Sequence, residues 1–130
     1  MRNFNKKINT ISFFVPCLNE EKNIGNTINN IIKSVKKTDF NFEIIIVDDN
    51  STDNTKGIIL DFKKNNPTLN ITLVENKLTM GLGRNYVDTA FIANGKYYML
   101  INGDNAEPKE TILTILKEVG KADMIIPFFD

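Results

Sequence analysis

The sequence predicts an α/β fold built around a mostly parallel sheet, and two observations carry that prediction. Short apolar runs rich in β-branched residues alternate along the 130 residues with longer segments of helical periodicity. The segments between successive apolar runs are long enough for the crossover connections that parallel strands require. No linker, low-complexity tract or internal repeat interrupts the pattern, so a chain of this length is expected to form one domain.

The apolar runs predict five strands. The first is stopped by Pro16, because proline has no backbone N–H to donate within a sheet. The second is almost unbroken (FEIIIV), which is typical of a strand covered on both faces. In chain order the predicted strands are residues 11–15, 42–47, 71–74, 97–101 and 124–126.

Two helices are predicted before the third strand. In the first, isoleucine and valine recur at helical spacing from Ile24 to Val35. The second runs over residues 52–64 with Ser51 as its N-cap, and two asparagines followed by Pro67 end it. Its expected apolar face consists of Ile58, Ile59 and Phe62.

Two further helices are predicted after the third strand. One follows the glycine-rich segment 81–83 and closes at Asn94-Gly95. The last begins with Pro108 at its first position, where a missing N–H costs nothing, and ends at Gly120. The residues expected to face inward from these helices are Tyr86, Val87, Ala90, Phe91, Ile112, Ile115, Leu116 and Val119.

The composition excludes several kinds of chemistry. Sixteen basic and sixteen acidic residues give a formal charge of zero, so no global field draws the chain to nucleic acid or to an anionic membrane. Histidine is absent, which excludes Ser-His and Cys-His nucleophile pairs and imidazole zinc ligands. A general base would have to be a carboxylate, and a bound metal would have oxygen ligands, as Mg²⁺ and Mn²⁺ prefer.

The sequence predicts a cytoplasmic protein. The one cysteine, Cys17, cannot form an internal disulfide, which favours a reducing compartment. Residues 1–10 are polar and lack the apolar region of a signal peptide. The longest apolar runs are far shorter than the ~20 residues of a membrane span.

Polar clusters follow three of the predicted strands. They are residues 16–21 (PCLNEE), 48–53 (DDNSTD) and 102–105 (NGDN). Ligands of open parallel sheets bind at the carboxyl ends of the strands, near the point where the strand order reverses. The fold alone is therefore expected to bring the three clusters to one edge, and this convergence is the main indication of a functional site.

Two of the clusters also have a purely structural interpretation. The pair Asp48-Asp49 suits a polar turn or a helix cap, although adjacent carboxylates repel and one of them could instead accept hydrogen bonds from a base or a ribose. Residues 102–104 suit either a metal site or a tight turn with Gly103 at positive φ.

Other polar features also have a structural alternative. Cys17 is expected to be a small buried residue and not a nucleophile, since no histidine can activate it. Arg84 follows residues 81–83, which fit neither the dinucleotide nor the P-loop pattern; it could contact a phosphate or a base, or be solvated. Glu20 and Glu21 suit the first turn of a helix through the helix dipole.

The clusters and their flanking runs resemble family 2 glycosyltransferases of the GT-A fold, which implies a Rossmann-like, three-layer α/β/α architecture. The segments that carry the resemblance are FFVPCLNEEKNIGNTINNII, EIIIVDDNSTDNT, GLGRN and YYMLINGDNAEP, in the family's order and spacing over residues 11–126. The combination of a V-P-x-x-N-E start with a V-D-D-x-S-x-D second motif is specific. Members that use polyprenyl-phosphate acceptors or decorate bacterial surface polysaccharides are the most similar in character.

The resemblance implies a site for a UDP- or GDP-linked sugar donor, with Mn²⁺ or Mg²⁺ bridging its diphosphate. Asp49 would hydrogen-bond the base with Asp48 supporting it, and Asp104 would be the last acid of the D-x-D metal motif. Asn102 stands in place of the first acid of that motif and offers a metal a carbonyl oxygen without charge. The other implied nucleotide-binding residues are Pro16, Leu18, Asn19, Glu20, Arg84 and Gly103.

The implied function is metal-assisted, inverting transfer of a sugar to a polyprenyl phosphate or a surface polysaccharide, in the cytoplasm or at the inner face of the membrane. The chain resembles the donor-binding half of such enzymes, before the acceptor half that supplies the catalytic base.

The alternative, favoured by Asn102, is a non-catalytic nucleotide-binding or interaction module. A phospho-acceptor receiver domain fits poorly, because its acidic pair follows the first strand and not the second. An exposed sheet edge would favour a homo-oligomer.

Overall fold

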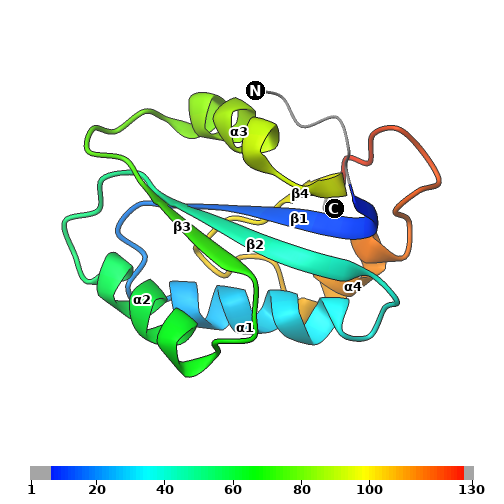
Figure 1. The fold of residues 1–130 in the computed structure, drawn as a ribbon, viewed down its shortest axis with the longest axis horizontal. Helices are drawn as coiled ribbons and strands as arrows, with labels where there is room; N and C mark the ends of the chain where they lie inside the picture. The colour runs from blue at the N-terminus through cyan, green and yellow to red at the C-terminus, as the bar shows by residue number, and fades with distance from the viewer. Residues whose placement is uncertain (1–6, 128–130) are drawn as a thin grey trace.

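The computed structural model describes residues 7–127, which form a four-stranded, all-parallel sheet with helices on both faces (Figure 1). The strand order is β3-β2-β1-β4, so the chain moves outward from β1 to β3 and then returns to the other side of β1. The strands are β1 (Lys7–Cys17), β2 (Asn41–Asp48), β3 (Ile71–Glu75) and β4 (Gly95–Leu100). This arrangement confirms the predicted α/β fold around a parallel sheet.

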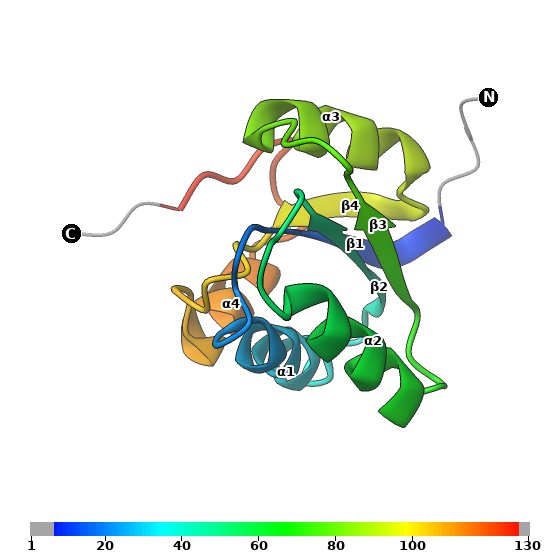
Figure 2. The ribbon, with the colours of Figure 1, turned by 90° about the vertical axis from the view of Figure 1, so that its left-hand side faces the viewer.

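The helices complete a three-layer α/β/α arrangement. Helices α1 (Ile24–Val35), α2 (Thr55–Asn65) and α4 (Lys109–Leu116) cover one face of the sheet (Figure 1, Figure 2). Helix α3 (Leu82–Ile92) covers the other face. Helix α1 contacts both α2 and α4. The main hydrophobic core therefore lies between these three helices and strands β1 and β2.

The two central strands, β1 and β2, are largely apolar on both faces because both faces are covered. Their residues in the main core, on the side of the three helices, are Ile11, Phe13, Val15, Ile44 and Ile46. On the α3 side, the Phe14 ring stacks on Tyr98 of β4 at a centroid distance of 6.0 Å and meets Tyr86 of α3 edge-on at 5.9 Å. This two-sided burial is the physical reason for the unbroken apolar run that predicted β2.

A buried acid fixes the connection between α3 and β4. Glu43 of β2 accepts hydrogen bonds from the Ser12 hydroxyl and from the Asn94 backbone N–H, both at 2.6 Å. The Ser12 hydroxyl in turn accepts the Gly95 N–H at 2.8 Å. The Asn94-Gly95 pair, predicted to close the helix, is therefore the turn that leads from α3 into β4.

Two predicted element ends are wrong. Strand β1 continues through Pro16 to Cys17, because these residues still pair with Val47 and Asp48 of β2. The Pro16 carbonyl accepts the N–H of Gly103, in the loop after β4, at 3.0 Å. Helix α2 begins at Thr55, and Asn54, not Ser51, occupies the N-cap position. Ser51 is held instead by the loop that follows β1.

Helix α3 turns a different side to the sheet than the sequence predicts. The buried residues are Asn85 and Thr89, which are 4% and 3% exposed. The expected inward residues Val87 and Phe91 are 51% and 52% exposed. Tyr86 is 44% exposed, but its ring still contacts Phe14 and Tyr98 of the sheet. The physical reason is a polar contact, because the Asn85 side chain accepts a hydrogen bond from the Asn76 side chain at 2.8 Å and so lies on the sheet side.

The C-terminal segment also differs from the prediction. Residues 124–126 form no strand, because no strand within residues 7–127 pairs with them, and the Met124 side chain is largely exposed. Pro108 is extended, with ψ of 154°, and occupies the N-cap of α4, not its first helical position. The helix ends at Leu116, ahead of Gly120, whose φ is 91°.

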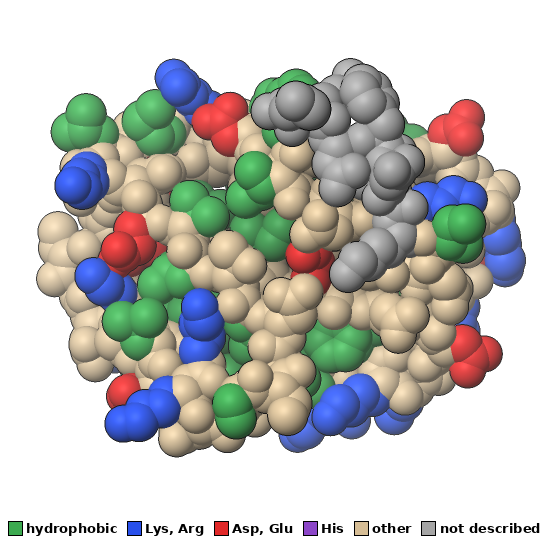
Figure 3. Space-filling model, viewed as in Figure 1, with side chains coloured by type: hydrophobic (Ala, Val, Ile, Leu, Met, Phe, Trp, Pro, Cys, Tyr) green, Lys and Arg blue, Asp and Glu red, His purple; other side chains and the backbone are tan. Residues whose placement is uncertain are grey.

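Two surface features complete the description. Within residues 7–127, none of the helices has both the length and the apolar character needed to cross a membrane. On the face shown in Figure 3, lysine and arginine side chains are interspersed with aspartate and glutamate. That distribution is expected of a chain whose formal net charge is zero.

Candidate functional site

The three polar clusters meet at one edge of the sheet. Strand β1 lies between β2 and β4, so the strand order reverses between β1 and β4. Cys17 at the end of β1 pairs with Asp48 at the end of β2, and the Gly103 N–H after β4 donates to the Pro16 carbonyl. The convergence predicted from the carboxyl ends of the strands is confirmed.

Asn19 fastens the β1–α1 loop to the β2–α2 loop. Its side-chain oxygen accepts the backbone N–H groups of Thr52 at 2.8 Å and Asp53 at 3.3 Å, and its own N–H donates to the Ser51 hydroxyl at 2.9 Å. Asn19 has a φ of 55°, in the left-handed region that asparagine tolerates better than most residues. Its side-chain oxygen therefore serves to shape this edge.

Glu20 and Glu21 strengthen the same junction. The Glu20 N–H donates to the Thr55 hydroxyl at 2.8 Å. The Glu21 N–H donates to the Asp53 carboxylate at 3.2 Å, while the Glu21 carboxylate accepts the Asn54 N–H at 3.0 Å. Both glutamates precede α1, whose first turn contains no acid, so the helix-dipole interpretation is wrong.

Asp48 has the structural role that the sequence allowed for it. Its side chain is buried, and one carboxylate oxygen accepts the Ser51 N–H at 3.0 Å. Its backbone carbonyl accepts the Asn76 N–H at 2.9 Å. Asp48 therefore shapes the turn after β2 and supports its neighbour Asp49.

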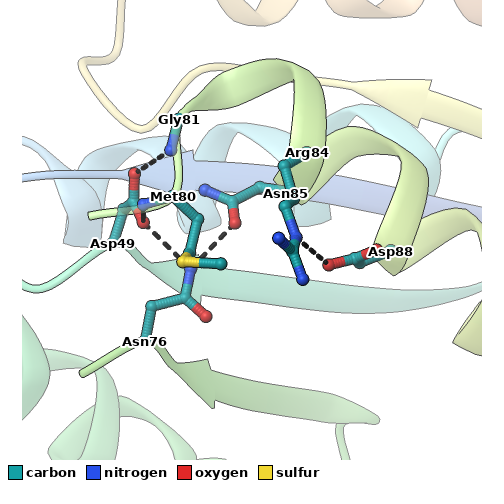
Figure 4. Close-up of polar contacts among 7 residues, drawn as sticks. All are labelled: Asp49, Asn76, Met80, Gly81, Arg84, Asn85 and Asp88. Atoms are coloured by element: carbon teal, nitrogen blue, oxygen red, sulfur yellow. Dashed lines mark hydrogen bonds and ion pairs between the residues drawn. The ribbon is translucent and has the colours of Figure 1, made fainter. Parts of the chain in front are cut away.

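Asp49 lies at the centre of a polar network that reaches α3 (Figure 4). Its Oδ1 accepts the Met80 N–H at 2.8 Å and the Asn76 side-chain amide at 2.9 Å, and its Oδ2 accepts the Gly81 N–H at 3.0 Å. Burial alone would raise the pKa of this carboxyl, but these hydrogen bonds, with a smaller contribution from the Asn85 amide, lower the pKa below its ordinary value. Asp49 is therefore a buried carboxylate held in its charged form.

Three other predicted residues lie near this edge with more open side chains. Arg84, in the first turn of α3, pairs with Asp88 at 3.4 Å, and its side chain is 63% exposed (Figure 4). Leu18 is 44% exposed at the tip of the β1–α1 loop, and Pro16 is half-buried. The solvated interpretation of Arg84 describes this structure, because its ion pair is local to α3.

Gly103 is needed for close packing and not for a positive φ. A Cβ atom at this position would lie 2.9 Å from the Cys17 Cβ and 3.0 Å from the Pro16 carbonyl oxygen. The Gly103 carbonyl accepts the Thr27 hydroxyl of α1 at 3.0 Å. The tight-turn interpretation is wrong in its detail, since the positive φ in this loop, 58°, belongs to Asn105.

The loop after β4 carries oxygen donors suited to a hard cation. Asp104 is exposed, and its Oδ1 accepts the Ala106 N–H at 3.0 Å, which leaves Oδ2 for a ligand. Glu107 has a buried oxygen, Oε2, without a hydrogen-bond partner in the described structure, and burial followed by the Asp104 charge raises the pKa of Glu107. The Asn102 side chain hydrogen-bonds Glu107.

This donor set fits Mg²⁺ or Mn²⁺ bound together with a phosphate ligand. Within residues 7–127 no three acidic or thiol side chains lie close enough to form a protein cage for a metal ion. Mg²⁺ does not require such a cage, because it is usually held by one or two carboxylates, substrate phosphates and water. Asp104 and Asn102 carry oxygens of the kind that such an open site uses.

Cys17 is a packing residue, as predicted. It is buried, and its thiol donates to the Val47 carbonyl at 3.5 Å. Burial, followed by the negative charges of Asp48 and Glu20, raises the pKa of the Cys17 thiol to about 12. A thiol in this state is not a nucleophile at neutral pH.

Sequence reasoning missed three polar residues of this edge. Asn76 directly follows β3, so the carboxyl-end rule that located the other clusters also indicates it. Asn85 lies four residues after Gly81, a spacing that places it over the helix start. Glu107 lies three residues after Asp104, next to the proline that precedes α4.

The chain is similar in sequence to enzymes that transfer sugars. It is 31% identical over 101 residues to dolichyl-phosphate beta-glucosyltransferase from Dictyostelium discoideum, covering 74% of this chain and 31% of that protein. It is 31% identical over 102 residues to abequosyltransferase RfbV from Salmonella typhimurium, covering 78% and 30%. It is 35% identical over 107 residues to poly-beta-1,6-N-acetyl-D-glucosamine synthase from Staphylococcus aureus, covering 71% and 25%. The chain thus spans about a third of the length of these relatives or less.

Solved structures share its fold. Residues 1–349 of Staphylococcus aureus TarS in complex with UDP-GlcNAc align with a TM-score of 0.63 and 27% identity, over 86% of this chain and 31% of that one. The mannosyltransferase PcManGT from Pyrobaculum calidifontis in complex with GDP-Man and Mn²⁺ aligns with a TM-score of 0.70 and 23% identity, over 85% and 32%. The pattern of glycosyl transferase family 2 matches residues 12–130. The chain therefore belongs to glycosyl transferase family 2.

Proposed function

We propose that the edge formed by the carboxyl ends of β1, β2 and β4 binds the nucleotide-diphosphate-sugar donor of a glycosyltransferase. The observation that carries the proposal is the buried, ionised Asp49, which follows β2 and whose backbone N–H donates to the Cys17 carbonyl at the end of β1. The complex of TarS with UDP-GlcNAc supports a nucleotide-sugar ligand, because TarS shares the fold at 27% identity.

In this proposal the loops after β1 and β2 hold the nucleoside. The Asp49 carboxylate accepts an N–H group of the base, since its charge and buried position favour a donor of that kind. The segment from Pro16 to Glu20 lies beside the base and ribose, with Leu18 offering exposed apolar surface for contact. Arg84 lies three residues after Gly81, whose N–H donates to Asp49. If the exposed ion pair with Asp88 breaks, the Arg84 side chain can contact a phosphate of the donor.

The loop after β4 holds the diphosphate through a divalent metal. When bound, Mg²⁺ or Mn²⁺ neutralises the charge that accumulates on the departing nucleoside diphosphate. Asp104 would hold this ion through its carboxylate and Asn102 through its amide oxygen, since within the described residues only Oδ1 of Asp104 is bonded, to the Ala106 N–H. Gly103 keeps these two residues against the end of β1, because a larger residue would not fit there.

The acceptor is a polyprenyl phosphate or a surface glycan, in line with the activities named for the relatives, and transfer inverts the anomeric carbon. The acceptor hydroxyl loses its proton to a carboxylate base as it attacks. We assign the base to the acceptor-binding half of a longer protein, because the aligned segments cover only 31% and 30% of these two relatives. We place the reaction in the cytoplasm, where the free Cys17 stays reduced.

Thermal unfolding with UDP, GDP, CDP and dTDP, each with and without Mn²⁺, tests this function. A nucleotide at 100 times its Kd stabilises the fold by about 2.7 kcal/mol, which shifts the midpoint by several degrees. We expect one nucleotide to stabilise the chain and Mn²⁺ to increase the shift. Absence of any shift in a folded sample contradicts the donor site. Binding without hydrolysis or transfer of the matching nucleotide sugar would indicate the non-catalytic module.

A further inference from the structure

Two asparagines that the sequence did not single out link Asp49 to α3. Asn76 follows β3, and its side-chain nitrogen donates to Asp49 Oδ1 at 2.9 Å and to Asn85 Oδ1 at 2.8 Å (Figure 4). Both protons of the Asn76 amide are therefore used, and both of its partners are acceptors. Asn85 lies in the first turn of α3 and is 4% exposed. The link consists of two part-buried hydrogen bonds, and the donor and the acceptor of each are fixed.

The hydrogen bonds distinguish the two oxygens of Asp49. Oδ1 accepts two, from Asn76 and Met80, while Oδ2 accepts one, from Gly81. An ionised carboxylate has about four acceptor positions, two on each oxygen. Oδ1 is therefore filled. Within the described residues Oδ2 accepts only the Gly81 bond and so has a second acceptor position. The Asn85 amide makes the smallest of the contributions that lower the pKa of this carboxyl.

We infer that Asn76 and Asn85 are positioning residues, which hold the Asp49 carboxylate so that Oδ2 accepts a ring N–H from a nucleobase. This inference rests on the proposed donor site. Asn76 fills Oδ1 and thereby fixes the rotation of the carboxylate, and Asn85 fixes Asn76. Asp49 is also bonded to the backbone of residues 80 and 81, so the same network fixes the carboxylate relative to the start of α3.

A carboxylate oxygen held in one direction distinguishes nucleobases that carry a ring N–H from those that do not. Uracil and guanine each present a ring N–H next to a carbonyl, which a carboxylate oxygen binds. Cytosine and adenine present a ring nitrogen with a lone pair at the corresponding position, which a carboxylate oxygen repels. A buried group that must be hydrogen-bonded discriminates strongly between such ligands, provided that its direction is fixed. Removal of either asparagine should therefore weaken the discrimination between bases more than it weakens binding of the diphosphate.

Isothermal titration of UDP, GDP, CDP and ADP in the presence of Mn²⁺ tests the inference. The variants are Asn76→Ala and Asn85→Ala, with Asn29→Ala, an exposed asparagine of α1, as the matched control. We expect the wild type and the control to prefer UDP or GDP. We expect each network variant to lose roughly tenfold of that preference, the size of one hydrogen bond to a charged group, by weakening the preferred nucleotide alone.

The outcomes separate the inference from the proposed function. If the wild type binds none of the four nucleotides, the donor site itself is wrong. If the wild type discriminates and both variants keep its preference, or lose affinity equally for every nucleotide, Asn76 and Asn85 have only a structural role.

A measurement on the wild type covers the case in which a variant does not fold. In ¹⁵N-resolved spectra, the side-chain amide resonance of Asn76 should shift when UDP or GDP saturates the chain, and should not shift with CDP. If the Asn76 resonance does not shift with any bound nucleotide, the inference is wrong.

Discussion

The backbone N–H of Gly103 donates to the Pro16 carbonyl at 3.0 Å, and this contact joins the loop after β4 to the end of β1. The two residues come from segments that the sequence separates widely, yet both flank the proposed donor site. The contact depends on the absence of a side chain, because a Cβ at position 103 would lie 2.9 Å from the Cys17 Cβ.

The variant Gly103→Ala should therefore lose both stability and metal response. The added methyl group cannot fit unless the loop shifts, which should lower the free energy of unfolding by about 1–3 kcal/mol. The shift would move Asp104, so Mn²⁺ should stabilise the variant less than the wild type. Urea unfolding with and without Mn²⁺ measures both effects. Unchanged stability would mean that this loop is not packed as described.

The charge of Asp49 should appear in the pH dependence of stability. Hydrogen bonds hold its folded pKa below the ordinary value of 3.8, so its contribution is present above that pH and is lost as the pH falls through the lower folded pKa. The variant Asp49→Asn should be about 2 kcal/mol less stable than the wild type at pH 7, since it loses hydrogen bonds to a charged acceptor. The difference should shrink below pH 3.8. Urea unfolding at a series of pH values checks this, and a difference that is constant with pH would contradict it.

Replacement of Asn102 by aspartate should strengthen the binding of Mn²⁺. The variant Asn102→Asp places a second charge beside Asp104, which should tighten Mn²⁺ binding by about tenfold in the presence of the bound nucleotide. Without metal the same variant should melt at a lower temperature than the wild type, because the new carboxylate lies near Asp104 and Glu107. Titration of Mn²⁺ followed by thermal unfolding measures both. Equal Mn²⁺ affinity in the two proteins would place the metal elsewhere.

The orientation of α3 can be tested with one pair of substitutions. Val87 is 51% exposed and Thr89 is 3% exposed, although the two lie on the same helix. Val87→Lys should change the free energy of unfolding by less than about 0.5 kcal/mol, whereas Thr89→Lys should be strongly destabilising because it buries a charge. Chemical unfolding of the two variants decides the matter. If Val87→Lys were the more destabilising of the two, Val87 would face the sheet, as the apolar spacing of the sequence predicts.

The sheet could be predicted because its central strands are covered on both faces. Phe14 is fully buried on one side of β1 and Phe13 on the other, and the apolar run around them is visible in the sequence. The segment 124–126 has the same composition but forms no strand, since a strand also needs a neighbour to pair with. Composition alone does not supply that neighbour.

The place of the site could also be predicted, but its internal contacts could not. The rule that ligands bind at the carboxyl ends of strands located Asp49 and Asp104 correctly at one edge. The rule says nothing of the bond between Asn76 and Asn85, which turns a polar side of α3 inward against its apolar spacing. Contacts of this kind join separate segments, and no local pattern encodes them.

Paramagnetic relaxation by Mn²⁺ tests the central claim most directly. In ¹⁵N–¹H spectra of the chain saturated with its preferred nucleoside diphosphate, a trace of Mn²⁺ should broaden the amide resonances of residues 102–105 first. The nucleotide alone should shift those of residues 17–20 and 48–52. Broadening centred elsewhere, or spread evenly over the acidic surface, would contradict a donor site at the carboxyl ends of β1, β2 and β4.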